Sequence, residues 1–285
     1  MQTKATQGWA LLVLVGCLLL TGSAWPDAIS AETAASQMAS EHQLFLPAVL
    51  KPEVFDPIPG ASYSTLCMSC VSGWVPTDRE PSQHADLNLA LRGWAETTAY
   101  RGLVDISGAY DEKAPQFYGL YADERVPPIS RVYRVYDWNW TLNQRAGLLS
   151  TWPVTLLGAA TIKGEIIQLP PRSDRLRPQD VDEVWLGSEG YVALVLYATS
   201  SSITLKFTRE DNVVHGYTIH LDGLQVDPRL VSLYQSCHAG GRRSLPALRE
   251  RQPFARAGGS ELRIAIRDNG SFMDPRSRKD WWYGH

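Results

Sequence analysis

The chain lacks any apolar run long enough to cross a membrane. Among its 285 residues the longest such run, Trp9 to Leu20, has about 12 residues, whereas a membrane-spanning helix needs roughly 20. The chain also lacks an excess of charge of one sign, because 27 basic and 30 acidic residues leave a net charge of −3. A mixed charge of this kind offers no electrostatic footprint for nucleic acid or for an anionic membrane. We therefore expect no transmembrane span and no nucleic-acid partner.

Short motifs of the common enzyme classes are missing as well. The sequence has no Gly-x-Ser-x-Gly elbow, no His-Glu-x-x-His, no phosphate loop and no dinucleotide fingerprint. Its acidic residues include no pair that sequence alone can place in one cleft, so a two-carboxylate glycosidase is unsupported. We expect no cofactor. Each absence lowers the expectation of an enzyme, and whether the protein is one stays open.

The first residues have the order of an export signal. Lys4 precedes the apolar run, and Thr21 to Ala24 end it with small residues at the positions that a signal peptidase inspects. This predicts a cleavable secretory signal over residues 1–24 and a secreted or periplasmic protein. An alternative interpretation is a lipoprotein box at Leu14 to Cys17, which would leave the protein lipid-anchored through Cys17.

The remaining composition favours a β-rich extracellular fold. The chain has 10 Trp and 12 Tyr against 6 Phe, with 22 Gly and 18 Pro, a mixture of strand-forming aromatics and turn formers. The segment from Trp25 to about Ser40 contains almost nothing to bury, and residues 25–55 are expected to be a disordered leader or linker. The segment from His42 to Pro52 resembles a short element that follows the signal in some bacterial exported proteins.

Residues 56–150 are expected to form an irregular, β-rich region. Asp86 to Arg92 alternates apolar and other residues, which predicts a half-buried strand, and Arg131 to Trp140 is an aromatic and β-branched run that predicts another. Arg101 to Ile106 is a third candidate. Whether this region is a separate domain stays open.

Residues 151–285 are expected to form a mainly β domain, an antiparallel sheet or open barrel with one inserted helix. Six runs bounded by turn residues are candidate strands: Val154 to Leu157, Glu165 to Leu169, Tyr191 to Tyr197, Ile203 to Phe207, Val213 to Leu221 and Leu262 to Ile266. The helix is predicted at about 228–239, because Asp227 can cap it, Pro228 suits its first turn and Gly240 can end it.

The order of motifs in this second half resembles a known family. Gly216 to Leu221, then Gln252 to Phe254, Glu261 to Ile266 and finally Asp268 to Pro275 are similar to the second half of the M23, lysostaphin-like, zinc endopeptidases. That family ends a strand with a His-Leu pair, continues to a His-x-His strand and closes with a hairpin ending in Asp-Pro. The resemblance implies an M23-type β scaffold and a place near bacterial cell walls.

The same alignment implies that the metal chemistry is lost. Arg263 falls where the family has a zinc-ligating histidine, and a guanidinium has no lone pair to give to a metal. His220 falls on the family's catalytic base and is the one catalytic candidate. No set of three protein ligands for zinc can be assembled, so we expect no metal site.

Three cysteines of the exported part are disulfide candidates: Cys67, Cys70 and Cys237. A thioredoxin-like redox motif would need a helix after Cys70, which the sequence there does not favour, and a zinc site would need the adjacent residues Cys237 and His238 as its other two ligands. We favour a structural disulfide with one cysteine left over. The pairing stays open.

Four tryptophans are candidates for binding sugar rings: Trp138, Trp140, Trp281 and Trp282. The competing interpretation for Trp138 and Trp140 is one buried face of a strand, since residues two apart share a face. The sequence thus leads to a hypothesis with two alternatives. The protein would be an exported, non-catalytic member of an M23-like scaffold that binds cell-wall glycan, peptide or a partner protein; it could instead be a zinc-dependent cell-wall endopeptidase, or an extracellular carbohydrate-binding module.

Overall fold

The structure is a computed structural model that describes residues 55–172, 186 and 189–285. The predicted signal at residues 1–24 and the predicted leader at 25–55, except its last residue, lie outside the described residues.

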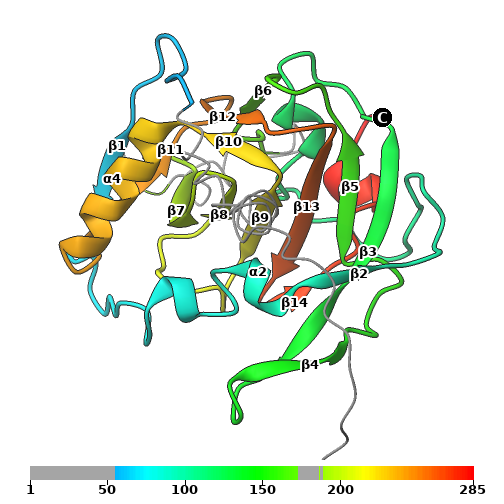
Figure 1. The fold of residues 1–285 in the computed structure, drawn as a ribbon, viewed down its shortest axis with the longest axis horizontal. Coiled ribbons are helices and arrows are strands. Elements are labelled where there is room, and N and C mark those ends of the chain that lie inside the picture. Colours follow the sequence, from blue (N-terminus) through cyan, green and yellow to red (C-terminus); the bar gives the residue numbers. More distant parts are fainter. Residues whose placement is uncertain (1–54, 173–185, 187–188) are drawn as a thin grey trace, which may run out of the picture. The chain divides into compact units, whose positions relative to one another are not determined.

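Most of the strands of the described chain belong to one antiparallel sheet of 11 strands (Figure 1). Its main path runs in the order β1 Ser64–Cys67, β11 Ser244–Leu248, β7 Ala193–Ala198, β8 Ser202–Lys206, β9 Tyr217–Asp222, β13 Glu261–Asp268, β5 Leu156–Ala160, β3 Ile129–Asn139 and β2 Trp94–Glu96. Two more strands lie off this path: β14 Ser271–Phe272 pairs with β13, and β4 Gln144–Leu148 pairs with β3. A separate sheet has three strands: β10 Leu224–Val226, β12 Pro253–Ala257 and β6 Ile166–Gln168. The prediction of a mainly β, antiparallel fold is confirmed.

The central strands form where apolar residues alternate with polar ones or run without interruption. β7 is apolar along its whole length and is buried at every position but Tyr197, which is typical of a strand covered on both faces. In β9 and β13 the residues of one face, such as Ile219 and Ile264, join the largest hydrophobic cluster. The other face of these strands is polar.

The predicted helix is present as α4, Pro228–Ala239. Asp227 caps it by accepting a hydrogen bond from the backbone N–H of Arg229 at 2.9 Å, and Pro228 occupies the first turn, where its missing N–H costs nothing. α4 lies against β11 and β7 (Figure 1). The other helical segments are short: α2 Leu89–Arg92, α5 Arg278–Trp281, and the 3₁₀ turns η1 Pro81–Gln83 and η2 Phe117–Leu120.

The predicted strand at Asp86 to Arg92 is wrong. This segment is a turn that leads into α2, and the side chain of Asn88 caps that helix by accepting from the N–H of Ala90 at 3.2 Å. The period-two pattern reflects burial of Leu87 and Leu89 against different neighbours and not alternation in a strand. The predicted strand at Arg101 to Ile106 is also wrong, because this segment makes only one isolated β-bridge, between Val104 and Ser277.

The first half of the described chain contributes strands to the same sheet as the second half. β1 pairs with β11, and β3 pairs with β5; residues 53–285 form one compact unit. The β3–β4 hairpin extends away from the rest of this sheet (Figure 1). None of the described helices is long and apolar enough to span a bilayer.

Candidate functional site

The polar face of β8, β9 and β13 is the candidate site, because His220, the one residue that the sequence predicts to be catalytic, lies on it. In the register of the sheet, His220 stands between Thr204 of β8 and Ala265 of β13, and Thr218 stands between Lys206 and Arg267. Since successive residues of a strand point to opposite faces, Thr204, Lys206, His220 and Arg267 share one side. The opposite side is the hydrophobic core.

Residues 84–92 cover this polar face. The hydroxyl of Thr204 donates to the carbonyl oxygen of Leu87 at 2.6 Å, and Arg267 donates to the carboxylate of Asp86 at 2.7 Å. Leu87 and Leu89, which belong to this segment, are buried. The polar face is therefore closed by the chain's own backbone and side chains.

His220 is enclosed in this layer, with 2% of its surface exposed. Its Nδ1 lies 3.0 Å from Thr204 Oγ1. The single hydroxyl hydrogen of Thr204 goes to Leu87, so Nδ1 carries the hydrogen of the ring and donates to Thr204. Nε2 then holds a lone pair, and it is buried with no hydrogen-bond partner among the residues that the structure describes.

Burial keeps this imidazole neutral. Burial is the larger cause, and together with the nearby positive charge of Arg267 it lowers the pKa of His220 to about 3. The ring also stacks on Phe272 at 6.2 Å between centroids. His220 has the lone pair of a base, but it faces protein and not a cleft.

A carboxylate between two guanidinium groups holds the cover in place. Oδ1 of Asp86 accepts from Arg92 Nη2 and from Arg267 Nη1, each at 2.7 Å. Burial alone would raise the pKa of Asp86, but the two arginines outweigh burial and the net shift is downward. These are ion pairs that join α2 to β13.

Arg263, at the position that the resemblance assigns to a zinc ligand, takes part in a second ion-pair group. Its Nε donates to Asp222 at 2.8 Å, and its Nη1 lies 3.5 Å from Glu261 Oε1. Its guanidinium also lies 5.2 Å from the ring centroid of Trp94. Within the described residues no three His, Cys, Asp or Glu side chains gather in a way that could hold a metal ion.

The four candidate tryptophans fall into two pairs. Trp281 and Trp282 are 2% and 0% exposed, and their indole N–H groups each donate at 2.9 Å to a backbone carbonyl, of Asp274 and Pro275 respectively. They pack around Phe117 in the core. The structure therefore places this pair in the interior.

Trp138 and Trp140 lie at the turn of the projecting β3–β4 hairpin: Trp138 is near the end of β3, and Trp140 is in the turn that follows. Trp138 is half-buried, and Trp140 has 40% of its surface exposed; their ring centroids are 6.4 Å apart. The guanidinium of Arg79 lies 5.0 Å from the Trp140 ring, and the ring of His84 meets it edge-on at 5.3 Å. We call Trp138, Trp140 and Arg79 the hairpin aromatic surface.

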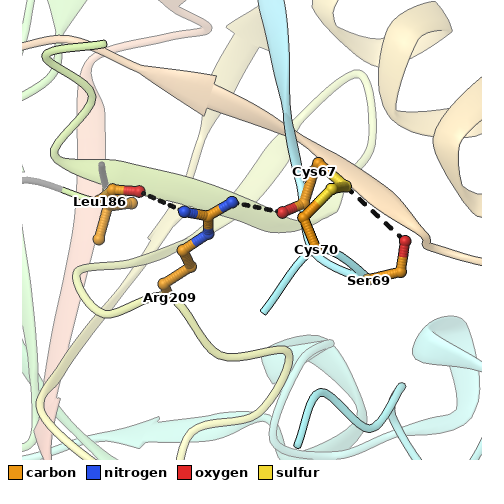
Figure 2. The surroundings of a disulfide bond; sticks show 5 residues. All are labelled: Cys67, Ser69, Cys70, Leu186 and Arg209. Atoms are coloured by element: carbon orange, nitrogen blue, oxygen red, sulfur yellow. Dashed lines mark hydrogen bonds between the residues drawn. A yellow bond between two sulfur atoms is a disulfide. The ribbon is translucent and has the colours of Figure 1, made fainter. Parts of the chain in front are cut away.

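Among the three candidate cysteines, Cys67 and Cys70 form a disulfide (Figure 2). Cys237 is free and half-buried in α4, where burial raises the pKa of its thiol. The predicted disulfide with one leftover cysteine is confirmed.

The sequence did not predict that Asp86, Arg92 and Lys206 take part in the polar face. Lys206 is buried, and burial lowers its pKa to about 8. One pattern in the sequence does indicate a polar face on β13, because Glu261, Arg263 and Arg267 are separated by even numbers of residues and alternate with apolar ones. Nothing comparable pointed to Asp86.

Comparison with protein-family models, with curated proteins and with solved structures found no match to this chain.

Proposed function

We propose that this protein is an exported, non-catalytic binding protein, in which an M23-like β scaffold has lost its metal chemistry and cell-wall glycan is bound at the hairpin aromatic surface. The observation that carries the proposal is the closed polar face. The residue aligned with a zinc ligand, Arg263, is engaged with Asp222, and the aligned base, His220, is enclosed under residues 84–92.

Export is supported by the first residues and by the disulfide. The order of Lys4, the apolar run to Leu20 and the small residues to Ala24 is typical of a secretory signal. Disulfides persist in oxidising compartments outside the cytosol, and Cys67–Cys70 is such a bond. Both observations favour a secreted or periplasmic protein.

The choice of glycan as ligand rests on the exposed ring of Trp140. An indole with 40% of its surface exposed offers an apolar face for the C–H groups of a sugar ring, and Tyr and Trp are favoured at binding surfaces for this combination of apolar body and polar edge. The guanidinium of Arg79, which donates to Asn143 and Asp78, lies over the Trp140 ring and adds its remaining N–H donors at that surface. This combination suits a polar, acetylated sugar polymer better than an apolar peptide.

Binding of soluble peptidoglycan fragments, measured by isothermal titration calorimetry, tests the proposal. Trp140→Ala should weaken binding about tenfold, the equivalent of losing one aromatic contact, whereas Trp140→Phe should retain most of it. Tyr100→Ala is the matched control, because Tyr100 is an aromatic residue with 70% exposure elsewhere on the molecule. Equal weakening by Tyr100→Ala and Trp140→Ala would remove the assignment to the hairpin aromatic surface.

A separate experiment tests the proposal that the protein is not a zinc endopeptidase. The purified protein is analysed for zinc and incubated with peptidoglycan, and release of soluble fragments is followed. We expect neither bound zinc in stoichiometric amount nor hydrolysis. Stoichiometric zinc together with hydrolysis would identify a zinc endopeptidase instead.

A further inference from the structure

We propose that the Cys67–Cys70 bond is an exchangeable disulfide that accepts electrons from the dithiol of another exported protein. The inference is independent of the proposed glycan binding, because it concerns a different part of the molecule. Three observations support it: Cys70 is exposed, the loop around the disulfide is held by other contacts, and a pocket lies beside the loop.

The two cysteines differ in accessibility. Cys67 is the last residue of β1 and is half-buried, whereas Cys70 lies in the following turn and is exposed. An attacking thiolate therefore reaches Cys70 Sγ first, and Cys67 becomes the leaving group. The hydroxyl of Ser69 lies 3.7 Å from Cys67 Sγ (Figure 2), where it can donate a hydrogen bond to the departing thiolate.

The loop is held by contacts that do not depend on the disulfide. Arg209 donates to the carbonyl oxygens of Cys67 at 2.5 Å and of Leu186 at 3.2 Å (Figure 2). The backbone N–H groups of Met68 and Ser69 both donate to the carbonyl oxygen of Arg243, at 2.8 and 3.1 Å, and the Met68 side chain is fully buried. A reduced loop would keep these anchors.

The bond also constrains the unfolded chain little. It joins residues that are three apart in sequence, and the loop entropy removed by a cross-link grows with the length of the loop. A bond with a small role in stability and an exposed sulfur is better suited to exchange than to reinforcement.

A pocket of about 300 Å³ begins next to Cys70. Residues 71–75 line one side and residues 209–212 the other. The wall at residues 71–75 carries the exposed apolar side chains of Val71 and Val75, Val75 to 71%, whereas residues 209–212 are charged or polar. The apolar wall suits an apolar residue next to the attacking cysteine of a partner. This defines the partner as a protein dithiol with an apolar flank.

The exchange takes place in two steps, in which the partner loses two electrons and the Cys67–Cys70 bond gains them. A partner thiolate attacks Cys70 Sγ, the Cys67–Cys70 bond breaks, and Cys67 leaves as a thiolate that takes up a proton. The thiolate of the partner's second cysteine then attacks the sulfur of the partner's first cysteine in the mixed disulfide, and Cys70 leaves as a thiolate that takes up a proton. The partner is oxidised to a disulfide, and Cys67 and Cys70 are reduced to two thiols.

Reduction of the folded protein is the first test. In the protein carrying Cys17→Ser and Cys237→Ser, Cys67 and Cys70 are the only cysteines left of the four. We expect dithiothreitol to reduce the bond while the circular dichroism spectrum stays native, and removal of the reductant in air to restore it. A bond that is reduced only when the protein unfolds would overturn the proposal.

Single-cysteine variants test which sulfur is attacked. With Cys67→Ser, the remaining Cys70 thiol should react with 5,5′-dithiobis(2-nitrobenzoate) about tenfold faster than the Cys67 thiol left by Cys70→Ser, because reactivity follows exposure. Equal rates would contradict the assigned order of attack.

The pocket is tested with two synthetic peptides, Leu-Cys-Leu and Ser-Cys-Ser, as reductants of the native bond. The Leu-flanked peptide should react several-fold faster, and Val75→Ser should abolish that preference while leaving reduction by dithiothreitol unchanged. An identical rate for both peptides would rule out partner recognition at this pocket.

Discussion

Replacement of His220 by glutamine should flatten the dependence of stability on pH. In the folded protein the ring is enclosed by Thr204 of β8, Arg267 of β13 and Phe272 of β14, with Asp86 and Arg92 of the covering segment nearby, and its pKa is lowered to about 3. In the unfolded chain the same ring titrates near ~6.5. Between these two values the unfolded chain binds a proton that the folded protein does not.

Stability must therefore fall as the pH drops below about 6.5, since protonation favours the unfolded chain. The two pKa values correspond to a loss of about 1 kcal/mol at pH 6 and about 2 kcal/mol at pH 5, relative to pH 7.5. A glutamine side chain can still donate to Thr204 but does not titrate, so His220→Gln should lack this loss. All other titrating groups are shared by the two proteins.

The assay is urea denaturation of both proteins at pH 7.5, 6.0 and 5.0, followed by far-ultraviolet circular dichroism. The variant should be less stable at pH 7.5, and the difference from the natural protein should shrink by about 2 kcal/mol on going to pH 5. A difference that stays constant over this range would show that His220 titrates normally in the folded state and would refute its enclosure.

Three further substitutions probe the contacts that hold the fold. Asp86→Asn should lower the free energy of unfolding, measured by urea denaturation, by about 3 kcal/mol, because two buried guanidinium groups lose their carboxylate. The same change at exposed Asp105 should have little effect. Similar losses at both positions would argue against the buried ion pairs. Asp227→Ala should cost about 2 kcal/mol, because it removes the helix cap and the acceptor of the Ile58 N–H at 2.8 Å; thermal unfolding would reveal this, and a melting temperature equal to that of Asp227→Asn would contradict it. Gly223→Ala should cost about 2 kcal/mol, because Gly223 has φ +89° and a Cβ there would lie 2.5 Å from a backbone oxygen; an unchanged denaturation midpoint would contradict that conflict.

The chain's local patterns predicted much of the secondary structure. The aromatic and β-branched run at Arg131 to Trp140 became β3, and the cap, proline and glycine around Pro228 to Ala239 became α4. Both depend on residues within a few positions of each other. Alternation failed at Asp86 to Arg92, because Leu87 is buried in a cluster with residues of β7 and β11, and Leu89 in another with residues of β3. Asn88 between them caps a helix.

By itself the sequence determined the β class, the long helix, the prediction of export and the presence of a disulfide among three cysteines. Only the tertiary structure decided which residues meet on the polar face, because Asp86 and Arg267 are 181 residues apart and no local pattern joins them. It also decided which tryptophans face solvent: Trp281 and Trp282 find core partners and carbonyl acceptors, whereas Trp140 is left exposed on a projecting hairpin. Burial and ion pairing depend on distant segments of the chain, and so the accessibility of His220, of Trp140 and of Cys70 follows from the fold.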